Sequence, residues 1–252
     1  EYIQPDQNND WVNQRDPNYK KYTRLISDEE GTGIIFNDNI VGISTARVSW
    51  VIGFRREKVL HNSEMLIDNY NAEVKNKQEN QIEPLERNDK EIKWTRGLIN
   101  KFRKAELIKF NATDLNEIMY RPFTKKWIYY DANIIESPGK FCSKFGKNNT
   151  VITTSGKGST KDFSVLVTDK IVNYDFLEKT QCFPYTEHDE EETLFGDTIN
   201  INEGFANKLG LSLDDTFAYI YGLLNSYEFQ QKYANDLKKD LARIPVVAEK
   251  AK

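Results

Sequence analysis

The residues TSGKGSTK, from Thr154 to Lys161, bring glycines, hydroxyl groups and ammonium groups together in one short stretch. The pattern resembles a nucleotide phosphate loop, but that motif requires Ser or Thr after its lysine, and here Gly158 follows Lys157. The glycine that should lie five residues before Gly156 is also missing. Backbone amides, hydroxyls and ammonium groups in such a loop could instead bind a DNA phosphodiester. An ordinary flexible turn is the alternative interpretation.

Other arrangements with catalytic or metal-binding chemistry are not found in the sequence. The histidines are His61 and His188, and neither has a Cys or His partner at the spacing of metal ligands. Asp214 and Asp215 lie at the start of an expected helix, where carboxylates interact favourably with the helix N-terminus. No Ser/His/Asp set and no Asn-Pro-Pro-aromatic methyltransferase tetrapeptide occurs. We therefore predict no catalytic residue, metal or cofactor in this chain, and an independent hydrolase is the least favoured alternative.

Charge is distributed unevenly along a chain whose formal net charge is −4. Residues 137–161 contain five lysines and no acid, and residues 93–109 contain six basic residues against one acid. Acidic residues gather elsewhere, in the EHDEEE segment of residues 187–192. A soluble protein that binds DNA through one face has this pattern. Many solvated charged surfaces share it, so charge alone leaves both alternatives open.

Length and composition describe a globular piece of a larger cytoplasmic protein. The 252 residues suffice for one large domain or two small ones, and the chain opens on a polar segment without Met. No apolar run approaches the roughly 18 residues of a membrane span. Cys142 and Cys182 are too few for a disulfide framework and fit idle thiols in a reducing cytoplasm.

Hydrophobic periodicity predicts an α+β fold, with a mixed, mainly antiparallel sheet of short strands, flanking helices and a helical C-terminus. The expected strands or extended segments are 33–39, 41–54, 127–131, 150–154, 162–169 and 171–174. The expected helices are 57–77, 94–107, 114 to before Pro122, 202–209, 213–225 and 227–239. We divide the chain into an N-terminal β/helical part (1–110), a strand-rich recognition core (111–200) and a helical part (201–252). Around YRPFTKKWIYYD we expect core packing by Phe123, Trp127 and Tyr129 or Tyr130.

Several ordered segments together resemble one protein family. They are STARVSWV (44–51), IDNYNAEV (67–74), IKWTRGL (92–98), YRPFTKKWIYYD (120–131), SGKGSTKDFSVLVTDKI (155–171), QCFPYT (181–186) and FAYIYGLLNSYEFQQKYANDLKKDLARIP (217–245). From about Asp10 to Pro245 the chain is similar to the C-terminal specificity region of type ISP restriction-modification enzymes. It departs from the family pattern at Ala46 and Val48, where Asn and Asp are frequent, and at Thr124, where Asp is common.

The resemblance implies that this chain is the target-recognition domain of a bacterial phage-defence enzyme. Such enzymes join nuclease, helicase-like motor and adenine methyltransferase modules in one polypeptide. The parent would use S-adenosylmethionine, ATP and Mg, whereas this domain would need no cofactor. Its implied partners are double-stranded DNA and the upstream methyltransferase and motor domains, with no membrane involved.

Candidate DNA contacts follow from combining the resemblance with the charge pattern. We expect phosphate contacts from side chains of the lysine-rich segment, namely Lys144, Lys147, Ser155, Lys157, Ser159, Thr160 and Lys161. A second group comprises Arg47, Arg121, Lys125 and Lys126. The alternative function is a docking module without base readout, in which the helical segment 217–242 packs on a neighbouring domain. Its aromatic face fits core packing as well.

Overall fold

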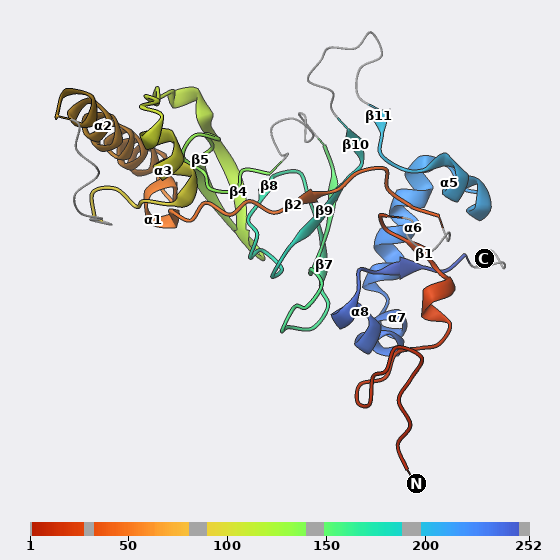
Figure 1. Ribbon diagram of the computed structural model, residues 1–252. Helices are drawn as coiled ribbons and strands as arrows, with labels where there is room; N and C mark the ends of the chain where they lie inside the picture. Colours follow the sequence, from red (N-terminus) through yellow and green to blue (C-terminus); the bar gives the residue numbers. More distant parts are fainter. Residues whose placement is uncertain (1, 28–32, 81–89, 140–148, 188–197, 247–252) are drawn as a thin grey trace. The chain divides into compact units, whose positions relative to one another are not determined.

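The computed structural model describes residues 2–27, 33–80, 90–139, 149–187 and 198–246 (Figure 1). The chain forms two compact units that are interleaved in sequence. Unit 1 comprises residues 1–42, 140–169 and 174–252, and unit 2 comprises residues 43–139 and 170–173. These units do not coincide with the parts 1–110, 111–200 and 201–252 that we expected.

Unit 2 contains a four-stranded sheet in the order β3-β5-β4-β8. Its strands are β3 (Ile52–Gly53), β4 (Leu115–Arg121), β5 (Thr124–Tyr129) and β8 (Ile171–Val172). β5 pairs antiparallel with β3 and β4, whereas β8 runs parallel to β4. The helix expected from residue 114 is wrong, because only the 3-10 turn Ala112–Asp114 precedes β4. Pairing with β5 overrides the helix propensity of Leu115, Glu117 and Met119.

The helices of unit 2 are α1 (Val48–Val51), α2 (Arg56–Asn80) and α3 (Arg96–Arg103). The expected helix at 57–77 is confirmed by α2, whose buried residues follow a helical period: Val59, Leu66, Ile67, Tyr70 and Val74. Extended structure across 41–54 is wrong in part, because α1 interrupts it after Ala46, whose φ is 54°. Trp94 contacts the rings of Tyr70 and Phe102 and so joins α3 to α2.

Unit 1 contains an antiparallel sheet in the order β2-β9-β6-β7. Its strands are β2 (Ile40–Val41), β6 (Val151–Thr154), β7 (Val165–Thr168) and β9 (Gln181–Pro184). Every residue of β6 is buried, as expected for a central strand. Two small antiparallel pairs complete the unit: β1 (Thr23–Arg24) with β12 (Arg243–Ile244), and β10 (Thr186–Glu187) with β11 (Thr198–Ile199).

The C-terminal part of unit 1 is helical, as predicted. Its helices are α5 (Glu203–Leu209), α6 (Leu213–Asn225), α7 (Tyr227–Lys232) and α8 (Ala234–Lys239), and a 3-10 turn at Tyr19–Lys21 lies near the other end of the chain. Asn202, Ser212 and Ser226 cap α5, α6 and α7 through their side-chain oxygens. The single helix expected over 227–239 is two helices, α7 and α8, that meet at Tyr233.

The core of unit 1 forms between its sheet and these helices. Ile152 and Phe183 of the sheet lie in one buried cluster with Ile220, Leu224 and Phe229 of α6 and α7. The hydrophobic face of segment 217–242 therefore packs largely within the unit. The architecture confirms the α+β fold class. No helix among the described residues is long and apolar enough to cross a membrane.

Candidate nucleic-acid interface

The TSGKGSTK segment begins at the end of β6, and most of it forms the loop that leads to β7. Ser155 closes the base of this loop, since its buried Oγ accepts a hydrogen bond from the Ser164 amide at 3.0 Å. The Gly156 amide donates to the Glu178 carbonyl at 3.0 Å. A Cβ atom at Gly156 would lie 2.1 Å from the carbonyl oxygen of Lys179, so only glycine fits without backbone movement. These contacts anchor the base of the loop to Ser164 and to residues 178–179.

The carboxylate of Glu178 occupies the donors that the loop presents. It accepts from the Ser159 hydroxyl at 3.0 Å, from the Thr160 amide at 3.0 Å and from the Thr160 hydroxyl at 3.1 Å. The Lys161 amide lies 3.3 Å from the same carboxylate. The bond from the Thr160 amide, helped by these hydroxyls, lowers the pKa of Glu178 to about 2. The anion that these loop donors bind is therefore a side chain of the protein itself.

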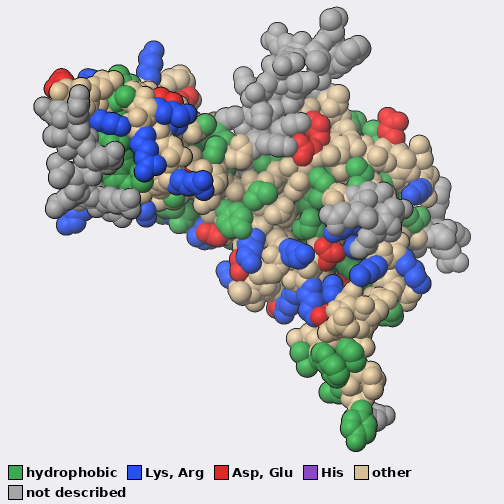
Figure 2. Space-filling view, viewed as in Figure 1, with side chains coloured by type: hydrophobic (Ala, Val, Ile, Leu, Met, Phe, Trp, Pro, Cys, Tyr) green, Lys and Arg blue, Asp and Glu red, His purple; other side chains and the backbone are tan. Residues whose placement is uncertain are grey.

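The lysines of this loop are placed differently from its hydroxyls. Lys157 and Lys161 are exposed, and no hydrogen bond or ion pair engages their ammonium groups within the described part of the chain. The Gly158 amide donates to the Lys238 carbonyl at 3.1 Å, which holds the loop against α8. Figure 2 shows Lys and Arg side chains gathered where this loop meets α8. Lys144 and Lys147 lie outside the described residues.

Arg47 is buried inside unit 2. Its burial corrects the prediction that it contacts DNA. Its side chain is 1% exposed, and Nε donates to the Lys93 carbonyl at 2.9 Å. The guanidinium also donates to the Ile134 carbonyl and to the Thr95 hydroxyl. Burial lowers the pKa of Arg47 to about 10, and nearby Glu136 opposes that shift. Arg47 therefore ties three segments of unit 2 together instead of meeting a ligand.

The β4–β5 hairpin carries the other predicted basic residues. Lys125 is exposed, while Arg121 and Lys126 are half-buried at the end of the sheet. Arg121 Nη1 donates to the Asn173 side chain at 3.0 Å. Burial, together with the charge of Arg121, lowers the pKa of Lys126. The hairpin thus concentrates three cationic side chains at one end of the unit 2 sheet.

Two exposed aromatic side chains accompany these cations. Tyr129 and Tyr130 are buried, as predicted for this segment, but the expected burial of Phe123 is wrong, because Phe123 is 88% exposed. Phe54, next to β3, is 70% exposed. Lys126 Nζ lies 3.7 Å from the ring centre of Tyr120 and 4.8 Å from that of Phe54.

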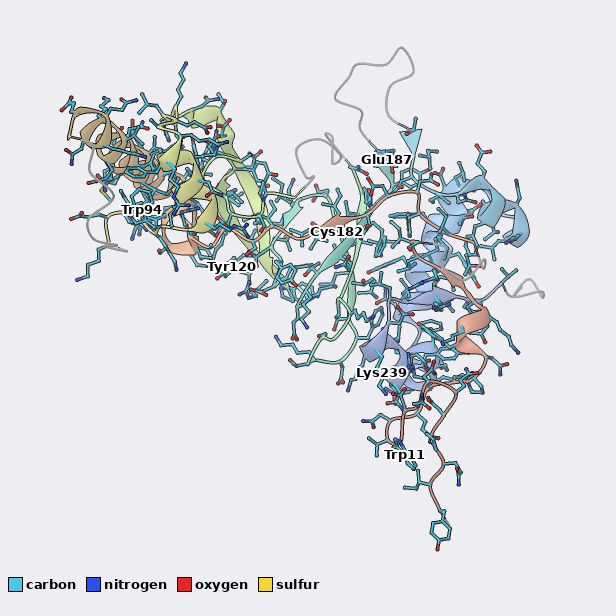
Figure 3. All side chains as sticks on the ribbon, in the orientation of Figure 1. Trp11, Trp94, Tyr120, Cys182, Glu187 and Lys239 are labelled. Carbon is cyan, nitrogen blue, oxygen red and sulfur yellow. The ribbon has the colours of Figure 1, made fainter. Side chains whose placement is uncertain are left out.

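The guanidinium of Arg121 also lies 4.3 Å from the ring centre of Tyr120, which Figure 3 labels near the end of β4. We call Phe54, Tyr120, Arg121, Phe123, Lys125 and Lys126 the hairpin cluster. The sequence predicts the cations of this cluster but not the exposure of its rings.

A shallow depression of about 510 Å³ lies along α3 in unit 2. It is lined by Trp94, Thr95, Arg96, Ile99, Asn100 and Arg103. The sequence showed the basic character of residues 93–109 but gave no reason to select these side chains. No group of three or more His, Cys, Asp or Glu side chains that could bind a metal occurs within the described ranges. Cys182 is a buried free thiol, and Cys142 and His188 fall outside those ranges.

The described part of the chain is thus an α+β domain that carries cationic side chains on its β6–β7 loop and on its β4–β5 hairpin. Residues 34–252 match the family model of the Type ISP C-terminal specificity domain. This chain therefore belongs to the Type ISP C-terminal specificity domain family, which confirms the resemblance in the sequence. No curated protein sequence matches the chain significantly.

Solved structures of larger proteins contain the same fold. A nuclease-deletion mutant of the Type ISP restriction-modification enzyme LlaGI, in complex with a DNA substrate mimic, matches with a TM-score of 0.85 and 34% identity over 97% of this chain. The ATP-dependent Type ISP restriction-modification enzyme LlaBIII bound to DNA matches with a TM-score of 0.84 and 28% identity over 98% of this chain. The DrdV–DNA complex matches with a TM-score of 0.83 and 26% identity over 99% of this chain. The present chain spans 23%, 16% and 26% of those chains, respectively.

Proposed function

We propose that this domain recognises a target sequence in double-stranded DNA on behalf of a type ISP restriction-modification enzyme. The observation that carries the proposal is that nearly the whole chain shares its fold with three proteins whose solved structures contain DNA or a DNA substrate mimic. The family match over residues 34–252 supports the same function.

The parent protein, in this proposal, is a cytoplasmic ATP-dependent restriction endonuclease with an adenine-specific methyltransferase. It would use S-adenosylmethionine, ATP and Mg in modules other than this one. The resemblance of the sequence supports this extension, as does the ATP dependence of LlaBIII. Target recognition would then position the upstream methyltransferase and motor domains on DNA.

Lysines at two places provide the electrostatic part of the proposed binding. Lys157 and Lys161 project from the β6–β7 loop of unit 1, and Lys125 and Lys126 belong to the hairpin of unit 2. Each phosphate that such a side chain neutralises releases condensed counterions, which makes affinity fall with salt concentration. The hydroxyls of Ser159 and Thr160 would reach a phosphate only if it displaced the carboxylate of Glu178. We therefore assign the loop's contact to its lysines.

A salt titration tests this assignment. Fluorescence anisotropy of a labelled duplex would give the dissociation constant of the full 252-residue chain at several salt concentrations. The double substitution Lys157→Ala with Lys161→Ala should weaken binding and reduce the slope of log K against log salt by about one unit per lost contact.

A matched control removes the same charge elsewhere on unit 1. Lys20 and Lys208 are exposed and lie outside the β6–β7 loop, so Lys20→Ala with Lys208→Ala should leave the slope nearly unchanged. Equal slopes for wild type and the loop variant would remove this loop from the interface. No binding of any duplex by the wild-type chain would contradict the proposed function itself.

A further inference from the structure

The turn at the tip of the β4–β5 hairpin has an unusual residue in its second position. Arg121 pairs with Thr124, so the connection consists of Pro122 and Phe123 alone. Proline fixes φ near −65° and therefore excludes the primed turn types that two-residue hairpins prefer. Phe123 has φ 59°, and a proline followed by a positive φ is the pattern of a type II turn. Glycine or asparagine normally occupies that second position.

Phenylalanine gains little burial at this turn, because Phe123 is largely exposed. A non-glycine residue in the left-handed region is disfavoured, and a bulky side chain there is a true outlier. Burial of the ring could offset that cost, but Phe123 remains 88% exposed. A large aromatic ring thus stands in solvent on a backbone that disfavours it. Strained backbone of this kind concentrates at functional sites, so the conformation points to a ligand for the ring.

The surroundings of Phe123 define the chemistry of that ligand. From Ile118 to Tyr130 the sequence contains Arg121, Lys125 and Lys126 but no acidic residue. The cations of the cluster lie beside aromatic rings, with Lys126 Nζ 3.7 Å from the ring centre of Tyr120. The partner must therefore be an anion that also presents flat apolar surface. DNA meets both requirements, because its phosphates are anionic and its unstacked bases have exposed faces.

We propose that Phe123 stacks on a base at an opened step of the bound DNA, while Arg121, Lys125 and Lys126 contact the flanking phosphates. This inference rests on the proposed function and deepens it by naming a residue and its mode of contact. Aromatic and aliphatic wedges at base steps open and bend duplexes in other proteins, at a cost of a few kcal/mol per step. A tight turn holds the ring at a fixed position, which suits a wedge better than a flexible loop does.

A DNA that is already open isolates the stacking contribution. Two labelled duplexes of the same sequence serve as probes, one fully paired and one with a single central unpaired base. Anisotropy titrations at one salt concentration give the preference of the full chain for the bulged duplex. We expect wild type to prefer the bulge, and Phe123→Ala to reduce affinity for the bulged duplex by between about fivefold and about 150-fold.

Two further substitutions separate stacking from folding. Phe123→Trp keeps an aromatic face and should retain the preference for the bulge. Phe123→Gly relieves the positive φ, so its loss of binding would not arise from a weakened fold. The matched control is Tyr227→Ala, because Tyr227 is an aromatic residue that is 71% exposed on α7 of unit 1.

The outcomes distinguish this inference from the proposed function. Loss of the bulge preference in the Ala and Gly variants, with retention in the Trp variant and the Tyr227 control, supports stacking. An unchanged preference for the bulged duplex in Phe123→Ala overturns the inference but leaves the proposed DNA binding intact. An equal loss of preference in Tyr227→Ala overturns the inference as well. In the first case, a neighbouring protein surface would remain as the partner of the ring. Absence of duplex binding by wild type overturns both.

Discussion

Replacing Arg47 by methionine should destabilise unit 2 without changing how the folded protein binds DNA. The side chain is 1% exposed and donates to the carbonyls of Lys93 and Ile134 and to the hydroxyl of Thr95. Methionine has a similar length but no donor, so the variant loses these three hydrogen bonds, while the Thr95 hydroxyl keeps its bond to Glu136. At about 1 kcal/mol for each lost hydrogen bond, the free energy of unfolding should fall by about 3 kcal/mol.

Urea denaturation followed by tryptophan fluorescence measures this loss directly. Trp50, Trp94 and Trp127 all lie in unit 2, so the signal reports mainly on the unit that contains Arg47. With a slope of about 1–3 kcal/mol per molar urea, the midpoint should move down by about 1–3 M. Arg55 is exposed in the same unit, and Arg55→Met should change the free energy by less than about 0.5 kcal/mol.

Either of two results would contradict a purely structural role for Arg47. A midpoint equal to that of wild type would show that the buried guanidinium does not support the fold. A smaller salt slope of DNA binding, measured where the variant is fully folded, would show that Arg47 neutralises a phosphate after all.

Three more predictions follow from local geometry. Phe123→Gly should raise the free energy of unfolding by about 0.5–1 kcal/mol and the melting temperature by about 1–4 °C. The reason is that glycine removes the backbone strain at φ 59°, and this gain exceeds the entropy cost of glycine. A lower melting temperature would show that the ring supports the fold. Gly156→Ala should lower the free energy of unfolding, measured by denaturant titration, by at least about 2 kcal/mol, because its Cβ would lie 2.1 Å from the Lys179 carbonyl oxygen. Gly222→Ala is the control: its Cβ would meet no atom within 4 Å, so the free energy of unfolding should stay the same or rise. The pKa of Glu178 in the folded protein is about 2, below its ordinary value of 4.5. The stabilisation that this carboxylate gives the folded protein is therefore full above about pH 4.5 and disappears as pH falls toward 2. A titration midpoint of the Glu178 carboxyl near 4.5, measured by NMR, would contradict the loop geometry.

Elements with a strong local signal could be predicted from the sequence. The apolar period from Val59 to Val74 defines α2 without help from the rest of the chain. Ser212 and Ser226 mark the starts of α6 and α7 in the same way, because their caps act within three residues. By contrast, β4 was missed because its extended form depends on pairing with β5, while its own residues favour a helix.

Composition predicts which charged residues the candidate interface contains, but not which partners they contact. The sequence identified the lysines near Gly156, but the anion of that loop is Glu178, which is 18 residues from Thr160 in the chain. The partners of Arg47 lie 46 and 87 residues away, so its burial left no local signal. Pro122 and the alternation in WIYY predict core packing for Phe123 together with Trp127. The exposure of Phe123 depends on a turn that breaks the ordinary residue preference.

The central claim is that this domain reads a DNA sequence, and a selection experiment tests it most directly. The full chain would be incubated with a pool of duplexes containing a randomised segment, and the bound DNA would be amplified and sequenced over several rounds. We predict that one asymmetric sequence is enriched and binds at least about 10³-fold more tightly than a scrambled duplex at the same salt concentration. Equal affinity for the selected and scrambled duplexes would contradict the claim.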